Sequence, residues 1–168
     1  MLPRLARLRV SLGFVLGLVA LVLAHPRRRS LLIGGVIATI GELIRIWAAG
    51  HLEKGREVTS SGPYAFTRHP LYLGSTVMGI GLAIASASLM VGAVVVIYLA
   101  VTLTAAIRTE EAHLTEKFGA AYPEYRNGRL GSVIRPFSLG RAMRNREYRA
   151  MIGLAVAFAV LGVKIYLR

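Results

Sequence analysis

The sequence predicts an all-α integral membrane protein with four to five transmembrane helices, built as one domain over residues 1–168. Hydrophobic residues make up 55% of the chain, the mean hydropathy is positive, and the apolar residues gather in long blocks. One block, from Leu71 to Ile107, contains no Asp, Glu, Lys, Arg or His. This run is too long for a single membrane crossing, which takes about 20 residues, and it fits two crossings.

Five apolar segments are the candidates for these helices. They cover roughly residues 8–24, 30–50, 71–87 and 89–107, with a fifth candidate at 150–167. The first follows several arginines and resembles a signal peptide, but Ala24-His25-Pro26 is a poor cleavage site, so we expect a retained helix. The fifth carries Lys164 near its end, and its length suits either a crossing or a helix lying along the interface.

The uncharged run predicts a helical hairpin with its turn at Ala85-Ser86-Ala87-Ser88. A hairpin returns the chain to the membrane face that it left. The polar segments on either side of it, residues 51–70 and 108–149, should therefore meet at one face. That meeting point is where we expect the chemistry of the protein.

The charge balance predicts contact with a membrane surface. The chain carries 21 Lys and Arg against 8 acidic residues, a formal net charge of +13. Because the cations border apolar blocks without interleaved aromatic residues, we expect anionic lipid head groups as partners and no nucleic acid. The positive-inside rule places the polar segments in the cytoplasm, at a prokaryotic plasma membrane, although Arg27-Arg28-Arg29 on the other side opposes this. The absence of Cys excludes disulfides and thiolate chemistry, and we expect no metal site.

Two charges interrupt the second apolar segment. Glu42 and Arg45 are three residues apart, so they share a helical face and can pair. The pair either fixes helix packing as a neutralised unit or lies at the mouth of the polar site. The sequence leaves both interpretations open.

Each polar segment has a structural interpretation when it is taken alone. Pro70 suits the first turn of a helix, and Gly62-Pro63 suits a turn. Glu110 and Glu111 fit a solvated face where a helix leaves the bilayer, and Gly119 fits its glycine cap. Their co-occurrence around one uncharged hairpin favours a shared function instead.

The two segments together resemble a known family of membrane methyltransferases. RHPLYLG at residues 68–74, a hairpin, EEAHLTEKFGAAYPEY at 110–125 and a later Pro136 are similar to the isoprenylcysteine carboxyl methyltransferases and the phospholipid methyltransferases. The resemblance covers about Arg45 to Phe137. It implies transfer of a methyl group from S-adenosylmethionine without a soluble Rossmann domain, in a pocket on the cytoplasmic side.

The resemblance also implies which side chains hold the cofactor. Carboxylates suit its ammonium and ribose hydroxyls, tyrosine faces suit its adenine and sulfonium, Arg and His suit its carboxylate, and glycines allow close backbone approach. The expected cofactor-binding residues are Tyr64, Arg68, His69, Tyr72, Gly79, Gly81, Glu110, Glu111, Tyr122 and Tyr125.

The acceptor is expected to be a membrane lipid or a prenylated small molecule. A carboxylate acceptor, which we favour, needs no general base, and Arg126 or Arg129 is the candidate that orients it. An amine acceptor must lose a proton, for which His69, His113 or a glutamate is available. The alternatives are a phospholipid amine N-methyltransferase, a non-catalytic scaffold of the same fold, and a sterol-type reductase. The sequence does not determine the oligomeric state.

Overall fold

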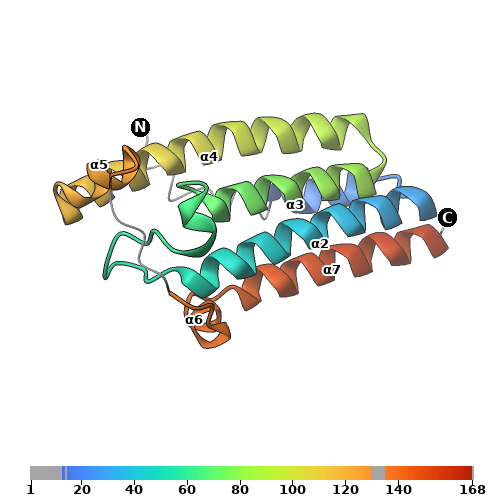
Figure 1. Cartoon of the computed structure of the whole chain (residues 1–168). Coiled ribbons are helices and arrows are strands. Elements are labelled where there is room, and N and C mark those ends of the chain that lie inside the picture. Colours follow the sequence, from blue (N-terminus) through green and yellow to red (C-terminus); the bar gives the residue numbers. More distant parts are fainter. Residues whose placement is uncertain (1–12, 14, 130–134, 168) are drawn as a thin grey trace.

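The computed structural model describes residues 13, 15–129 and 135–167, and every regular element among them is a helix. In chain order these are α2 Arg28–His51, the 3-10 helix η1 Gly62–Ala65, α3 Pro70–Ser86, α4 Leu89–Phe118, α5 Ala121–Arg126, α6 Leu139–Arg144 and α7 Tyr148–Tyr166. Residues 15–23, which precede α2, are also helical. The long helices lie side by side, and the short ones gather at the end where α2 and α4 finish (Figure 1).

Three helices, α2, α4 and α7, are long and apolar enough to cross a membrane. The apolar helix α3 has 17 residues. At a rise of 1.5 Å per residue it is about 25 Å long, slightly less than the hydrocarbon core of about 30 Å. The all-α fold is therefore confirmed for the described residues, with three helices suited to a membrane crossing, whereas four to five crossings stays a prediction. Part of the predicted segment 8–24 lies outside the described residues.

The predicted hairpin is present. α3 ends at Ser86, Ala87 adopts a left-handed conformation with φ of 49°, and the Ser88 hydroxyl accepts a hydrogen bond from the Val91 N–H at 3.4 Å. The apolar span predicted at 89–107 lies within α4, which continues to Phe118 and stops at Gly119, as the glycine cap predicted. The loss of apolar character marks where the chain leaves the bilayer, while good helix formers carry the helix further.

Small residues bring α2 and α3 into the most extensive helix contact of the described structure. A Cβ atom added to Gly41 would lie 2.5 Å from the Met78 backbone nitrogen, and one added to Gly74 would lie 2.7 Å from the Gly41 carbonyl oxygen. Backbones that approach this closely need small residues at the contact. The first half of α3 is consequently fixed against the second half of α2.

The C-terminal segment is tied to α2 at the polar end and to residues 15–23 at the other end. The Asn145 side-chain amide donates to the carbonyl oxygens of Ala49 and Leu52, both at 2.9 Å. Lys164 donates to the carbonyl oxygen of Leu21 at 2.8 Å. α7 therefore runs beside α2 (Figure 1) and places Glu147, just before its first residue, next to α2.

Candidate functional site

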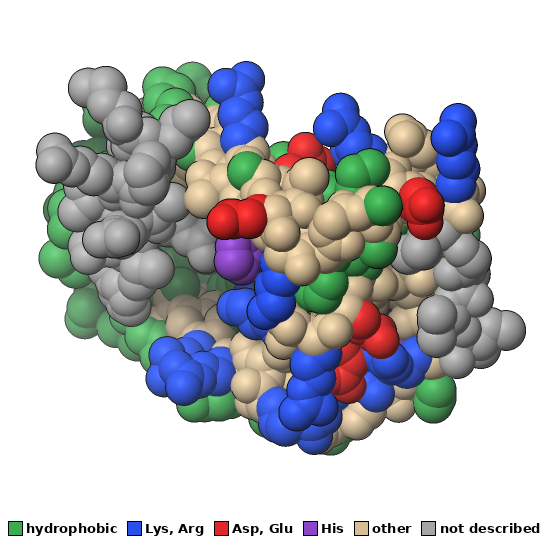
Figure 2. Space-filling model, turned by 90° about the vertical axis from the view of Figure 1, so that its left-hand side faces the viewer, with side chains coloured by type: hydrophobic (Ala, Val, Ile, Leu, Met, Phe, Trp, Pro, Cys, Tyr) green, Lys and Arg blue, Asp and Glu red, His purple; other side chains and the backbone are tan. Residues whose placement is uncertain are grey.

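The polar ends of α3 and α4 meet in one cluster. His69 Nε2 lies 3.0 Å from Glu111 Oε1, and Arg68 Nη1 donates to the same oxygen at 3.1 Å. The Tyr72 hydroxyl donates to Glu110 Oε2 at 2.5 Å. The predicted meeting of the two polar segments at one face is confirmed. Figure 2 looks onto this end of the molecule, where basic, acidic and histidine side chains gather.

Local structure explains how the hairpin presents these groups. His69 precedes the first residue of α3, and Pro70 occupies that first position, where its missing N–H costs nothing. His69 and Tyr72 are three residues apart, and their rings stack with centroids 5.6 Å apart. Glu110 and Glu111 lie on the part of α4 that extends beyond the apolar block, so their carboxylates face the start of α3.

The tyrosines of α5 and η1 cover this cluster. The Tyr125 hydroxyl donates to the Tyr64 carbonyl oxygen at 2.6 Å, and the rings of Tyr122 and Tyr125 lie 6.1 Å apart. Tyr122 is 2% exposed, and its hydroxyl makes no hydrogen bond of ordinary geometry to the described residues, although the Glu111 carboxylate lies near it.

Burial makes these phenols poor acids. It raises the pKa of Tyr122 to about 12, with the Glu111 charge adding to the effect. It also raises the pKa of Tyr64 and of Tyr125. All three hydroxyls are therefore protonated at neutral pH and can donate hydrogen bonds.

The structure brings together eight of the predicted site residues. They are Tyr64, Arg68, His69, Tyr72, Glu110, Glu111, Tyr122 and Tyr125. The two predicted acceptor-orienting arginines, Arg126 and Arg129, are both exposed at and beyond the end of α5. Their role stays a prediction.

Helix packing explains the predicted glycine pair. A Cβ on Gly79 would lie 2.6 Å from Cδ1 of Leu99 on α4, while one on Gly81 would overlap the backbone nitrogen of Ala38 on α2. The two glycines thus serve close contacts on different sides of α3. Their predicted cofactor contact is untested.

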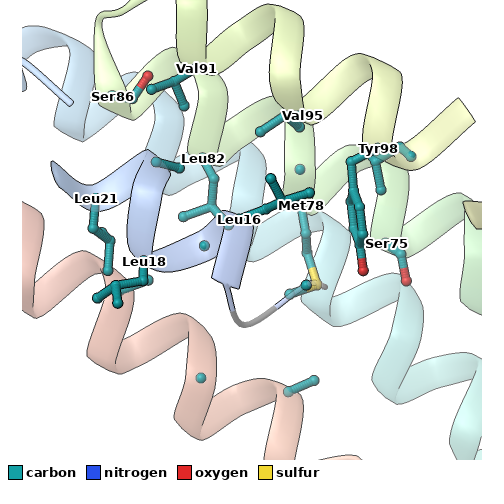
Figure 3. Close-up of a pocket in the computed structure, with 18 of the residues that line it drawn as sticks. Leu16, Leu18, Leu21, Ser75, Met78, Leu82, Ser86, Val91, Val95 and Tyr98 are labelled. Atoms are coloured by element: carbon teal, nitrogen blue, oxygen red, sulfur yellow. The ribbon is translucent and has the colours of Figure 1, made fainter. Parts of the chain in front are cut away.

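A large cavity lies below the cluster, within the apolar part of the bundle. Its volume is about 1010 Å³, and residues 15–21, α3, α4 and α7 form most of its wall. Ser75 and Tyr98 lie near one end, and Ser86 and Val91 near the other (Figure 3). Neither this cavity nor a smaller one between α3 and α4 is lined by Glu110 or Glu111, so the cofactor pocket expected at the cluster stays a prediction.

Sequence reasoning missed the closest ionic partner of Arg45. Its Nε lies 3.8 Å from Glu42, as the spacing predicted, but 2.6 Å from Glu147 Oε1. Arg45 Nη1 also donates to Ser75 Oγ at 2.5 Å. One sequence feature could have indicated this pairing. Glu147 stands directly before an apolar segment, where a carboxylate is expected to need a partner.

Comparison with known families agrees with this geometry. The sequence profile described as phospholipid methyltransferase matches residues 32–121, which include most of α2, all of α3 and α4, and both polar motifs up to the start of α5. The chain belongs to the phospholipid methyltransferase family. Its members are methyltransferases, and the suspected resemblance is confirmed.

Two proteins that are similar to this chain are named as metal resistance proteins. The chain is 32% identical over 126 residues to the cobalt-zinc-cadmium resistance protein CzcN of Cupriavidus metallidurans, covering 70% of this chain and 56% of that protein. It is 30% identical over 110 residues to the nickel-cobalt-cadmium resistance protein NccN of Alcaligenes xylosoxydans xylosoxydans, covering 60% and 52%. The chain thus spans about half the length of these relatives. No solved structure matches it.

Proposed function

We propose that this protein transfers a methyl group from S-adenosylmethionine to a lipid or prenylated acceptor at the membrane interface, with a carboxylate oxygen as the favoured acceptor atom. The observation that carries the proposal is the cluster of Arg68, His69 and Glu111 beside Tyr72 and Glu110. These contacts join the two motifs on which the family resemblance rests.

The residues present fit S-adenosylmethionine. The ammonium group suits Glu110 or Glu111, and the cofactor carboxylate suits Arg68. The buried Tyr122 hydroxyl lies beside the Glu111 carboxylate and is a further donor at the cluster. When bound, the cofactor supplies a methyl carbon that forms a C–O bond with the acceptor while the C–S electron pair leaves with sulfur.

The protein's own task is alignment. Holding donor and acceptor in line in a dry site can lower the barrier by several kcal/mol, up to roughly 7–11 kcal/mol. The hydrogen bonds within the cluster fix the side chains before the ligand arrives, so less ordering remains when it binds. A carboxylate acceptor gives up no proton, so this reaction asks the site for position and not for a base.

A second candidate is methylation of a phospholipid amine, which the description of the family favours. An amine must be neutral to attack, and His69, held by Glu111, is placed to accept its proton. The products separate the two reactions, because a methyl ester releases methanol in base whereas a methylated amine is stable.

We also propose that the cluster faces the cytoplasm. Most basic residues outside the apolar segments lie at the cluster end, in accordance with the positive-inside rule. Because S-adenosylmethionine is charged and does not cross the bilayer, inverted vesicles should use the added cofactor. Activity confined to right-side-out vesicles would reverse this orientation.

Calorimetric titration of the purified protein with S-adenosylhomocysteine tests the cofactor assignment. We expect binding by the wild type and at least a tenfold loss of affinity in Glu111→Gln, because a hydrogen bond to a charged group contributes about 1.5–3 kcal/mol. Glu116→Gln is the matched control, since Glu116 is an exposed glutamate further along α4. Binding of NADPH in place of S-adenosylhomocysteine, with the fold intact, contradicts the proposal.

A further inference from the structure

The apolar cavity and the polar cluster follow one stripe of α3. Tyr72, Ser75, Gly79, Leu82 and Ser86 recur at intervals of three and four residues, so they lie on one face of the helix. The last four line the cavity, and Tyr72 at the top of the stripe binds Glu110. The cavity therefore begins one helical turn below the cluster.

The shape of the cavity suits a long apolar chain. From Ser75 to Ser86 the axis of α3 advances about 16 Å at 1.5 Å per residue. The volume of about 1010 Å³ is at the upper end of ligand pockets, and the wall is almost wholly apolar. A chain of fatty-acyl or isoprenoid length fits such a space better than a compact polar ligand.

Two arginines lie at the polar end of the cavity, and one of them, Arg45, is paired with Glu147 and Glu42, which lie outside the lining. Arg45 and Arg149 are the charged residues among those that line it, and no carboxylate belongs to the described lining. Arg45 is the inner of the two, with a side chain that is 20% exposed, whereas Arg149 is exposed. An amphiphile whose chain fills the cavity would present its head group to Arg45.

Neighbouring groups hold the Arg45 guanidinium at the level of the cluster. Glu147 binds its Nε, while its Nη1 donates to Ser75 Oγ and, at 3.4 Å, to the carbonyl oxygen of Leu71. Leu71 is the residue directly before Tyr72. The side chain is thus fixed on the α2 side of the same turn of α3 that carries His69 and Tyr72 toward α4.

We propose that Arg45 orients the carboxylate of an amphiphilic acceptor whose apolar chain occupies this cavity. The acceptor role of the ligand rests on the proposed function, whereas its binding does not. The assignment replaces the exposed Arg126 and Arg129 with an arginine whose guanidinium is held by Glu147 and Ser75 at the polar end of the cavity. Arg45 is a positioning residue, since the carboxylate oxygen and the methyl carbon react without it.

Photo-cross-linking tests the inference in phosphatidylcholine nanodiscs without cofactor. The probes are a photoreactive hexadecyl carboxylate and the matched hexadecyl alcohol and hexadecyl phosphate. We expect the carboxylate to label cavity residues and the alcohol to label them at least tenfold less. Preferential labelling by the phosphate, or equal labelling by carboxylate and alcohol, overturns the inference.

Three variants separate the head-group contact from folding. Arg45→Gln should lose the preference for carboxylate over alcohol, and Arg45→Lys should recover part of it, because a charge remains without the fork geometry. Val94→Trp fills the cavity and should abolish labelling, whereas Val101→Trp, at a position that is 51% exposed and outside the lining, should not. Unchanged labelling in Val94→Trp contradicts the inference even if Arg45→Gln fails to fold.

The same samples distinguish this inference from the proposed function. Carboxylate labelling without any binding of S-adenosylhomocysteine leaves the cavity assignment intact and removes the transferase. Binding of S-adenosylhomocysteine without labelling of the cavity keeps the transferase and removes the role of Arg45.

Discussion

At the scale of single residues, the site depends on a few short contacts between side chains distant in sequence. One carboxylate oxygen of Glu111 contacts both Arg68 and His69. The Tyr125 hydroxyl closes α5 over the cluster through its bond to the Tyr64 carbonyl oxygen. Each contact joins a residue before the hairpin to one after it, so the site forms only when the whole hairpin is folded.

The buried Tyr122 phenol makes the stability of the folded protein depend on pH. A phenol with a folded-state pKa of about 12, above its unfolded value of about 10, binds its proton more tightly in the folded protein. Its contribution to stability is present below about pH 10 and is lost as the pH rises toward 12. We expect the melting temperature in detergent to fall over this range, and to fall less in Tyr122→Phe.

Tyr148→Phe is the control for that measurement, since Tyr148 is an exposed tyrosine at the start of α7. A wild-type melting temperature that stays constant between pH 10 and 12 would show that Tyr122 is not buried as described. An equal loss in Tyr122→Phe and in the wild type would assign the effect to other groups.

The sequence predicted the residues of the polar cluster but not two of the residues that bind Arg45 beside it. Arg68, His69, Glu110 and Glu111 were identified because they form dense polar motifs at the edges of an uncharged run. Glu147 was not, because its partner Arg45 lies 102 positions away and only the packing of α7 on α2 brings them together. Ser75 has no sequence signal either, since a serine within an apolar helix commonly bonds its own backbone, as Ser75 also does.

At the scale of helices, the position of the site depends on how closely α2 approaches α3. Gly81 meets the backbone of Ala38, and Gly41 meets that of Met78. Gly81→Ala should therefore lower the melting temperature by several degrees, because overpacking a tight contact costs roughly 1–3 kcal/mol. Thermal unfolding followed by circular dichroism measures the change.

Gly162→Ala provides the comparison for this substitution. Gly162 lies inside α7, and a Cβ atom there meets nothing within 4 Å. Replacing Gly by Ala raises the helix propensity equally at both positions. The difference between the two melting temperatures therefore reports the contact of α2 with α3. A Gly81→Ala protein as stable as Gly162→Ala would mean that the two helices do not pack as described.

The helix boundaries show what hydropathy does and does not encode. The turn near Ala87 was predicted because an uncharged run of that length must fold back within the bilayer. The extension of α4 to Phe118 had a different signal, because residues 108–118 are polar but favour a helix and Gly119 predicted its cap. This extension carries Glu110 and Glu111, so it is the part of the element that matters for the site.

At the scale of the whole molecule, the polar cluster and the apolar cavity are stacked along the bundle axis. The cluster at the end of α3 and α4 suits a water-soluble charged cofactor, and the cavity below it suits a chain drawn from the bilayer. Under the proposed function, each reactant approaches this site from the phase in which it dissolves.

Incubation with S-adenosylmethionine labelled in its methyl group and a total lipid extract tests the central claim most directly. The account predicts labelled lipid with the wild type, label released as methanol in base, and at least a tenfold loss with Glu111→Gln. Correctly folded protein that labels no lipid or prenylated acceptor, while a known transferase labels the same extract, contradicts it.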